Sequence, residues 1–546
     1  MDPPQVSQQA KGTQIPMHSL ETSNIDALVA SLPPVASPDG AFVASVTANR
    51  LQIRAASSLS IVRSIPLPAE YSPKNSPIIR WSHIGSRQGL RFLFADERTV
   101  RVWDITDSRW KAVVDNGSGG MGKIANVEFG SSQDEVLVFS DFGARVTVWC
   151  LKTGRSVEIR DPKYYKDSRG HGYRPRNPVF ALLSRTGPQD TLTIHAPGTY
   201  FLLKTITLPS SDAQGLKWSP DGKWLVVWDA ASIGFKLFVY TADGHLYRTY
   251  SGDEDEAIRG LGIKSIEWSP RGDYLAAGGH DQRVTLLSTR TFSPAVFLDH
   301  TSIVQLSSGE VWQEQVSPVR EYTLVPQPVS PPVAQPTAAE AASKKGISIL
   351  AFNISGDLVA TRDDSMPTCV WLWDLTGLTA RTVLIQHAPV KSLYWHSSIP
   401  NLLLIQCAQD DTVIYLWDLE KEGARVVDVP FERSMGKLEA RWLHDDADRR
   451  PSLIFGNTGG FVTVWPDGKD AILKFSHSSS RPGTPGSNDE SEDSLYNILT
   501  GRTPVPALED STSYEDYENS AESTVLEDTF HGKKYLMDPL RDSECF

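Results

Sequence analysis

The sequence has few cysteines, no long hydrophobic run and no excess of positive charge. Its four cysteines are scattered, so neither a disulfide framework nor a CxxC zinc motif is expected. No uncharged apolar run reaches the roughly 18 residues that a membrane span needs. The first 20 residues are polar, so a secretory signal is not expected either. A reducing cytosolic or nuclear compartment is the expected location, with no membrane partner.

Negative charge is distributed unevenly along the chain. The 546 residues carry a formal net charge of −13, and residues 476–546 contain fifteen acidic and five basic side chains. The tail therefore holds −10, which leaves only −3 for the other 475 residues. A nearly neutral body with an acidic tail lacks the basic residues of a general DNA or RNA binder, so no nucleic-acid partner is expected.

Tryptophan recurs at two positions of a repeated unit. The first position follows a short apolar run and is occupied by Trp81, Trp218, Trp268, Trp395 and Trp442. The second position ends a strand-like run and is occupied by Trp103, Trp149, Trp373, Trp417 and Trp465. The two positions are 22 residues apart in the pairs 81–103 and 395–417. A constant offset of this kind indicates an internal repeat.

Each repeated unit reads as four β-strands. A first strand ends in W-S-P-x-G, which favours a turn, and a second apolar strand follows. A third strand ends in W-D, and a basic or Thr-rich strand closes the unit. This pattern resembles WD repeats and implies an all-β fold, a WD-repeat β-propeller of about nine four-stranded blades.

The units predict the following domain organisation. Residues 1–35 form an N-terminal segment that can contribute a closing strand, and residues 36–304 form about six blades. Residues 305–345 form a Pro-rich insertion, residues 346–475 about three blades, and residues 476–546 an acidic Ser/Thr-rich tail. Nine blades exceed the usual four to eight. The units form either one large ring or two propellers that are separated by the insertion.

The insertion and the tail are both predicted to be disordered. Six prolines from Pro318 to Pro336 favour a polyproline-like loop, and the tail has too little apolar content to fold. Four residues precede proline and are candidate phosphorylation sites, namely Ser317, Ser330, Thr484 and Thr503.

Three segments resemble one family of WD-repeat proteins more than generic repeats. They are Trp224–Ser251, Gly262–Leu287 and Lys344–Asp374, with the insertion between the second and third. This order is similar to that of the WD-repeat protein of centrosomes and fungal spindle pole bodies. The resemblance implies a non-catalytic adaptor that helps to anchor microtubule minus ends and supports spindle assembly. It implies two partners, a coiled-coil spindle-pole anchoring protein and a minus-end-directed kinesin, and leaves the oligomeric state open.

Two motifs resemble catalytic or ligand sites, and each is better explained by structure. Gly117–Lys123 matches G-x-x-x-x-G-K, but Ile124 replaces the expected Ser or Thr and a strand pattern follows, so an inter-blade loop is expected. His387, Asp411 and Trp417 match a His, Asp and Trp set that can lie together in a WD repeat, so a buried structural network in one blade is expected.

The remaining polar residues suggest no catalytic, cofactor or metal site. His171, His280 and His300 lack ligand spacing and are predicted in turns or on the surface. The pairs 363–364 and 410–411 are Asp residues expected to hold turns. The basic, aromatic segment Lys163–Arg176 is expected to be a solvated loop, with a protein contact or single-stranded nucleic acid as alternatives.

Two other functions stay open at the level of sequence. One is a different WD-repeat adaptor, for example a substrate receptor of a ubiquitin ligase or another cytoplasmic complex. The other is a propeller hydrolase, which requires clustered acids or a metal in the central channel.

Overall fold

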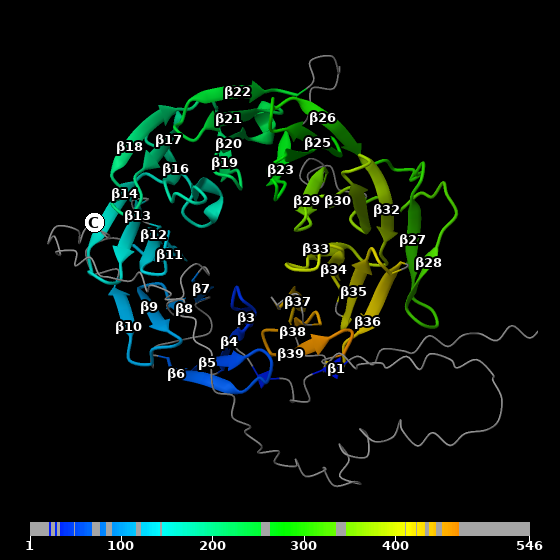
Figure 1. The fold of residues 1–546 in the computed structure, drawn as a ribbon, viewed down its shortest axis with the longest axis horizontal. Coiled ribbons are helices and arrows are strands. Elements are labelled where there is room, and N and C mark those ends of the chain that lie inside the picture. Colours follow the sequence, from blue (N-terminus) through cyan, green and yellow to red (C-terminus); the bar gives the residue numbers. More distant parts are fainter. Residues whose placement is uncertain are drawn as a thin grey trace, which may run out of the picture. The chain divides into compact units, whose positions relative to one another are not determined.

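The computed structural model describes residues 21–22, 28–29, 33–47, 50–67, 77–82, 90–115, 122–141, 145–252, 262–334, 345–409, 411–421, 423–431, 436–443 and 450–468. These residues form 39 strands and two short 3-10 helices, η2 (Ser168–Gly170) and η3 (Ala231–Ile233). The strands build nine sheets, which we name blades 1 to 9 in chain order (Figure 1). The predicted all-β propeller of about nine four-stranded units is confirmed. No helix in this part of the chain is long and apolar enough to span a membrane.

Blades 1 to 3 each contain four consecutive antiparallel strands. Blade 1 comprises β3 (Val35–Ala36), β4 (Phe42–Thr47), β5 (Arg50–Ala55) and β6 (Ile61–Pro66). Blade 2 comprises β7 (Ile78–Trp81), β8 (Arg91–Ala95), β9 (Thr99–Asp104) and β10 (Lys111–Asp115). Blade 3 comprises β11 (Ile124–Phe129), β12 (Glu135–Ser140), β13 (Arg145–Cys150) and β14 (Ser156–Arg160).

Blades 4 to 6 have the same topology. Blade 4 comprises β15 (His171–Tyr173), β16 (Phe180–Arg185), β17 (Asp190–His195) and β18 (Leu202–Thr207). Blade 5 comprises β19 (Ala213–Trp218), β20 (Trp224–Asp229), β21 (Leu237–Thr241) and β22 (Leu246–Tyr250). Blade 6 comprises β23 (Ile263–Trp268), β24 (Tyr274–Gly279), β25 (Arg283–Ser288) and β26 (Pro294–Asp299).

Blades 7 to 9 follow the insertion. Blade 7 contains β29 (Ile347–Phe352), β30 (Leu358–Asp363), β31 (Cys369–Asp374) and β32 (Thr379–Ile385). Blade 8 comprises β33 (Val390–Trp395), β34 (Leu402–Cys407), β35 (Val413–Asp418) and β36 (Ala424–Asp428). Blade 9 contains β37 (Glu439–Trp442), β38 (Leu453–Asn457) and β39 (Gly460–Trp465), together with β1 (Glu21–Thr22) and β2 (Leu28–Val29).

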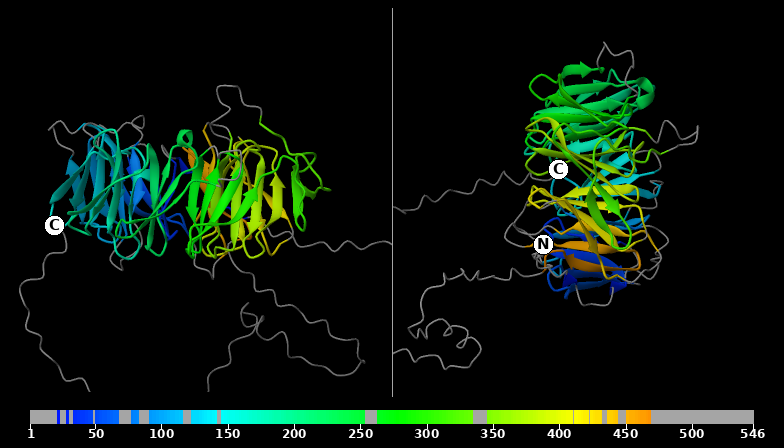
Figure 2. Two further views of the ribbon diagram at one scale, coloured as in Figure 1. Left: turned by 90° about the horizontal axis from the view of Figure 1, so that it is seen from above. Right: turned by 90° about the vertical axis from the view of Figure 1, so that its right-hand side faces the viewer.

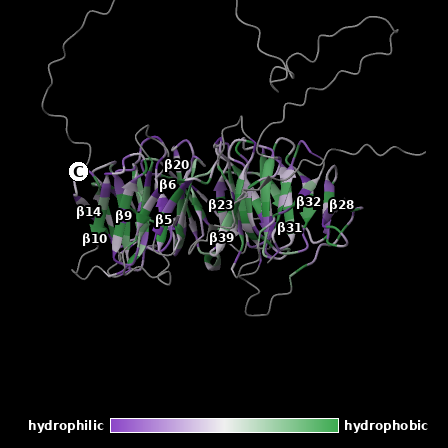
Figure 3. Ribbon diagram, turned by 90° about the horizontal axis from the view of Figure 1, so that it is seen from below, coloured by the Kyte–Doolittle hydropathy of each residue, from purple (hydrophilic) through white to green (hydrophobic). Residues whose placement is uncertain are grey.

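Burial along a blade explains the sequence pattern of its strands. Every residue of β8, β12 and β34 is buried, because neighbouring blades cover both faces of the second strand. The fourth strand β14 alternates between exposed and covered residues, since it lies at the outer edge. Hydrophobic residues accordingly concentrate in the strands and hydrophilic residues in the connecting loops (Figure 3).

Nine hydrophobic clusters join consecutive blades into one closed ring. Each cluster combines buried side chains of two neighbouring blades. One of them packs Ala276 of blade 6 with Val359 of blade 7, so the insertion does not separate two propellers. Another packs Val43 of blade 1 with Phe461 of blade 9 and closes the ring. The strands run between two faces that carry the loops (Figure 2).

The N-terminal segment also takes part in ring closure. β1 pairs antiparallel with β39, with Glu21 opposite Trp465, and β2 pairs with the same strand, with Leu28 opposite Phe461. The first described strands therefore complete the sheet formed by β37, β38 and β39. Hydrogen bonds between the two ends supplement the packing of blade 1 on blade 9.

The insertion contains a β-hairpin, so the prediction of a disordered, polyproline-like loop is wrong for its described residues. β27 (Glu310–Gln315) pairs in parallel with β32 and antiparallel with β28 (Glu321–Leu324). The prolines lie outside both strands, where the missing N–H removes no bond of the ladder. The hairpin extends blade 7 to six strands at the periphery of the ring (Figure 1).

Candidate functional site

The five tryptophans of the first repeat position tie each of their blades to the preceding blade. Each indole Nε1 donates to a backbone carbonyl oxygen in the first strand of that blade. The pairs are Trp81 with Val35 (3.0 Å), Trp218 with Gly172 (3.1 Å), Trp268 with Lys217 (3.4 Å), Trp395 with Ala351 (2.9 Å) and Trp442 with Tyr394 (2.8 Å). A covered indole N–H needs an acceptor, so the repeat encodes a bond between blades as well as packing.

The tryptophans of the second position lie in the third strands of their blades. Trp103, Trp373, Trp417 and Trp465 are buried, and Trp149 is half-buried. The Trp417 ring meets the Trp395 ring edge-on, with 6.1 Å between centroids. These side chains are part of the packing between blades.

His300 is buried between blades 6 and 7, so the prediction of a surface or turn position is wrong for this histidine. Its Nε2 lies 2.7 Å from Thr361 Oγ1, and its Nδ1 lies 3.1 Å from the carbonyl oxygen of Gln282. Trp373 Nε1 donates to the same Thr361 hydroxyl at 2.8 Å. Burial lowers the pKa of His300 to about 4, although the Asp363 carboxylate acts in the opposite direction. The histidine is therefore a neutral structural group at pH 7.

The other two histidines differ from each other. His171 is buried as well, with its Nε2 3.1 Å from Glu128 Oε2 in blade 3, so the surface prediction is wrong for it too. His280 is half-buried in the turn after β24.

The predicted network of His387, Asp411 and Trp417 does not form. The His387 side chain is exposed, and among the described residues its backbone N–H alone makes a hydrogen bond, to Glu314 of the insertion hairpin at 2.7 Å. Asp411 Oδ2 accepts from Arg320 at 2.8 Å instead of from the histidine. Glu314 and Arg320 of the insertion hairpin lie over blade 8. They bind the His387 backbone and the Asp411 side chain in place of the predicted contact.

Glu314 and Arg320 are the centre of the contact between the hairpin and blade 8. The Glu314 side chain is fully buried, and its Oε1 accepts from Arg320 at 3.0 Å and from the Tyr415 hydroxyl at 2.8 Å. Arg320 also donates to Tyr415 and to Asp411, both at 2.8 Å. Burial raises the pKa of Tyr415, and Glu314 adds to this shift, so the phenol stays protonated. Sequence patterns do not predict this network because its members lie up to 101 residues apart.

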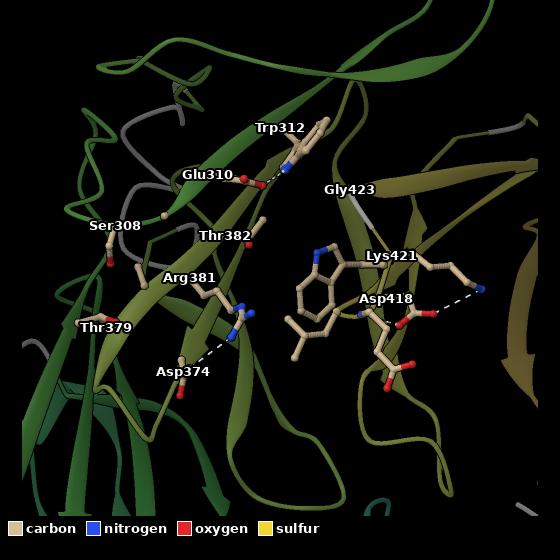
Figure 4. A pocket seen from close by; sticks show the side chains of 15 residues that line it. Ser308, Glu310, Trp312, Asp374, Thr379, Arg381, Thr382, Asp418, Lys421 and Gly423 are labelled. Atoms are coloured by element: carbon tan, nitrogen blue, oxygen red, sulfur yellow. Dashed lines mark hydrogen bonds and ion pairs between the residues drawn. The ribbon is translucent and has the colours of Figure 1, made fainter. Parts of the chain in front are cut away.

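A groove opens where the hairpin begins. It encloses about 390 Å³ between the start of β27, the strand β32 with the turn before it, and the turn that joins β35 to β36. Arg381 extends into it from β32, and Lys421 lies on the opposite side (Figure 4). The lining residues are Ser308, Gly309, Glu310, Trp312, Asp374, Thr379, Ala380, Arg381, Thr382, Trp417, Asp418, Leu419, Glu420, Lys421 and Gly423.

The prediction of a solvated loop for Lys163–Arg176 holds for residues 166–169, which are exposed, but not for Lys163 or for the strand that follows. The segment runs through η2 into β15, the first strand of blade 4. Lys163 Nζ is buried and lies 2.7 Å from carboxylate oxygens of both Asp190 and Asp212. Its positive charge is therefore used within the fold and is not offered to an acidic partner or to nucleic acid.

The remaining candidate motifs have structural surroundings. Residues 122–123 precede the strand β11, so no helix follows the G-x-x-x-x-G-K match, and its residues 117–121 lie outside the described part. Asp363 accepts from the N–H groups of Gly346 and Ser365, and Asp364 pairs with Lys264. Among the described residues, no group of three His, Cys, Asp or Glu side chains is placed to hold a metal ion.

The candidate phosphorylation sites divide into two pairs. Ser317 is exposed in the turn between β27 and β28, and Ser330 is exposed after β28. Thr484 and Thr503 belong to residues 469–546, which lie outside the described residues, as does the acidic tail. All four sites stay predictions.

Comparisons with known proteins identify WD-repeat relatives. The family model "WD domain, G-beta repeat" matches residues 244–286, in blades 5 and 6. The mouse WD repeat-containing protein WRAP73 is 28% identical over 431 residues, which cover 74% of this chain and 88% of the mouse protein. An uncharacterized WD repeat-containing protein of Schizosaccharomyces pombe is 27% identical over 460 residues, which cover 80% and 92%.

Solved structures show a weaker likeness. A crystal structure of a eukaryotic initiation factor has a TM-score of 0.46 at 13% identity, covering 75% of this chain and 93% of that one. The chain is therefore a nine-bladed β-propeller that is similar to WD repeat-containing proteins, and part of its blades 5 and 6 matches the WD-repeat model.

Proposed function

We propose that the chain is a non-catalytic scaffold of the spindle pole body or centrosome. In this role it helps to anchor microtubule minus ends and supports spindle assembly. Its partners are a coiled-coil anchoring protein and a minus-end-directed kinesin, as the family resemblance implies.

The order of three sequence segments carries this proposal. Trp224–Ser251 supplies β20 to β22, Gly262–Leu287 supplies β23 to β25, and Lys344–Asp374 supplies β29 to β31. The insertion follows β26, between the second and third segments, as in the family that the sequence resembles. The similarity to the mouse and fission-yeast proteins spans most of all three chains, which supports a shared architecture.

The construction of the molecule suits a scaffold. A closed ring leaves its loops, outer strands and insertion hairpin exposed while nine clusters hold the core. Function on such a fold is carried by surface sites and not by the ring itself. The insertion hairpin is the element that distinguishes blade 7 from the other blades.

Proximity labelling in mitotic cells tests the proposal. A biotin ligase fused to the full-length chain should enrich coiled-coil spindle-pole proteins and a minus-end-directed kinesin over the ligase alone. Subunits of a ubiquitin ligase without any spindle-pole protein would favour the alternative of a substrate receptor and overturn the assignment.

A further inference from the structure

We propose that the groove beside the insertion hairpin is a docking site for an extended segment of a partner protein that presents an arginine or lysine side chain. The inference assigns a surface and a ligand chemistry to the scaffold. It does not depend on where in the cell the scaffold acts.

The walls of the groove are held by close packing. Gly423 has a φ of +78°, and a Cβ at this position would lie 3.3 Å from the Trp312 ring, so the indole lies close against the β35–β36 turn. A Cβ at Gly309 would lie 2.5 Å from the carbonyl oxygen of Arg381, which places the start of β27 directly on β32. A groove that exists before binding loses little entropy when a ligand enters it.

Negative charge exceeds positive charge in the groove. Four carboxylates line it, from Glu310, Asp374, Asp418 and Glu420, against the two cations Arg381 and Lys421. Both cations already face carboxylates, since Arg381 lies 3.5 Å from Asp374 and Lys421 lies 3.5 Å from Asp418. The net charge of −2 favours a cationic side chain and disfavours an acidic peptide or a phosphate.

Glu310 and Trp312 provide the combination that a guanidinium or ammonium group prefers. Trp312 Nε1 donates to Glu310 Oε2 at 3.1 Å, so the carboxylate and the half-buried indole are held side by side. A cation placed there gains a charge-assisted hydrogen bond and an attraction to the ring.

The same chemistry already occurs between blades 2 and 3. The Arg91 guanidinium lies 3.7 Å from the centroid of the Trp110 ring. Asp134 pairs with it at 2.5 Å and Asp104 at 3.5 Å. The blade fold therefore accommodates a guanidinium between an indole and carboxylates.

The size and charge of the groove indicate a segment from another chain. About 390 Å³ holds one long side chain with its flanking backbone, as expected for an extended peptide. The acidic tail of the same chain has a net charge of −10, so like-charge repulsion disfavours it as the occupant.

Surface plasmon resonance with the immobilised full-length chain tests the proposal. The probe is a nonapeptide of glycine and serine with arginine at its centre, compared with the same peptide carrying lysine, citrulline or glutamate. A photo-crosslinker beside the central residue reports the binding site by mass spectrometry. We expect the arginine peptide to bind about tenfold more tightly than the citrulline peptide and to crosslink within residues 308–312 or 417–423.

Variants that remove a carboxylate test whether the preference for the arginine peptide arises in the groove. Glu310→Gln with Glu420→Gln should abolish the preference for arginine, and each single change should reduce it about threefold. Glu158→Gln, on the outer strand of blade 3, should keep the preference. Circular dichroism melting curves check that each variant is folded. If the double variant is not folded, the single variants are used for the test.

Four outcomes would overturn the proposal. They are equal binding of the arginine and citrulline peptides, tighter binding of the glutamate peptide, no binding of any peptide up to about 5 mM, and an unchanged preference in the variants. Self-association in analytical ultracentrifugation that disappears in Glu310→Gln would instead identify a second copy of this chain as the occupant.

Discussion

We expect Glu314 to stabilise the contact between the insertion hairpin and blade 8. Glu314→Ala removes a carboxylate that accepts from Arg320, from the Tyr415 hydroxyl and from the His387 N–H. Arg320, whose side chain is 14% exposed, then keeps Asp411 as its acidic partner. Removing one partner of a buried ion pair costs about 3–5 kcal/mol. Each hydrogen-bond donor that is left without an acceptor costs about 1–3 kcal/mol. We expect the free energy of hairpin opening to fall by at least about 3 kcal/mol.

Hydrogen exchange measured by mass spectrometry gives a local readout of this loss. Amides of β27 and β28 should exchange about a hundredfold faster in Glu314→Ala, while the other blades change little. Glu158→Ala is the matched control, because its pair with Arg145 has a carboxylate that is 42% exposed and contributes less than about 1 kcal/mol. Arg320→Met added to Glu314→Ala should recover part of the protection. An increase below about threefold, or an equal increase in all blades, would refute the reasoning.

Three further perturbations have defined outcomes. Trp417→Ala should destabilise the ring by about 3–5 kcal/mol in urea unfolding, because the buried ring packs on Trp395; a loss below about 1 kcal/mol would contradict its place in the core. Since the pKa of His300 is lowered to about 4 from 6.5, its stabilising contribution is complete above pH 6.5 and is lost as the pH falls toward 4. Unfolding measured across this range should show a loss of about 3 kcal/mol that is absent in His300→Gln; an equal loss in both proteins would refute this. Deletion of residues 476–546 should leave the cooperative melting transition intact, since the ring clusters lie within residues 35–464 of the described chain; loss of the transition in calorimetry would show otherwise.

Periodicity made the blades predictable. The first-position tryptophans end first strands and the second-position tryptophans lie in third strands, because a blade repeats the same local pattern of strand and turn. Their constant offset reflects the length of the second strand, of the two turns beside it and of the third strand up to its tryptophan. A one-dimensional pattern of this kind can be read without knowing any long-range contact.

The insertion was mispredicted because its high proline content does not show that the prolines lie outside the strands. Pro318 and Pro326 bracket β28 without entering it, so a Pro-rich stretch still contributes a strand. His300 was missed for a related reason. The insertion separates it from Trp373, which lies in the same network, so the expected spacing within one repeat is lost.

The burial and pairing of charged side chains were the other features that the sequence did not predict. Lys163 reads as part of a basic surface loop, yet its partners Asp190 and Asp212 lie 27 and 49 residues away. Glu314 and Arg320 likewise obtain their partners only when the hairpin folds onto blade 8. Pairings of this kind depend on tertiary contacts that local sequence does not record.

Live imaging of the full-length chain, fused to a fluorescent protein, tests the proposed function most directly. Through mitosis the fusion should form a focus at each spindle pole, coincident with microtubule minus ends. A diffuse signal at every stage of mitosis, from a fusion that is shown to be folded and expressed, would contradict the account.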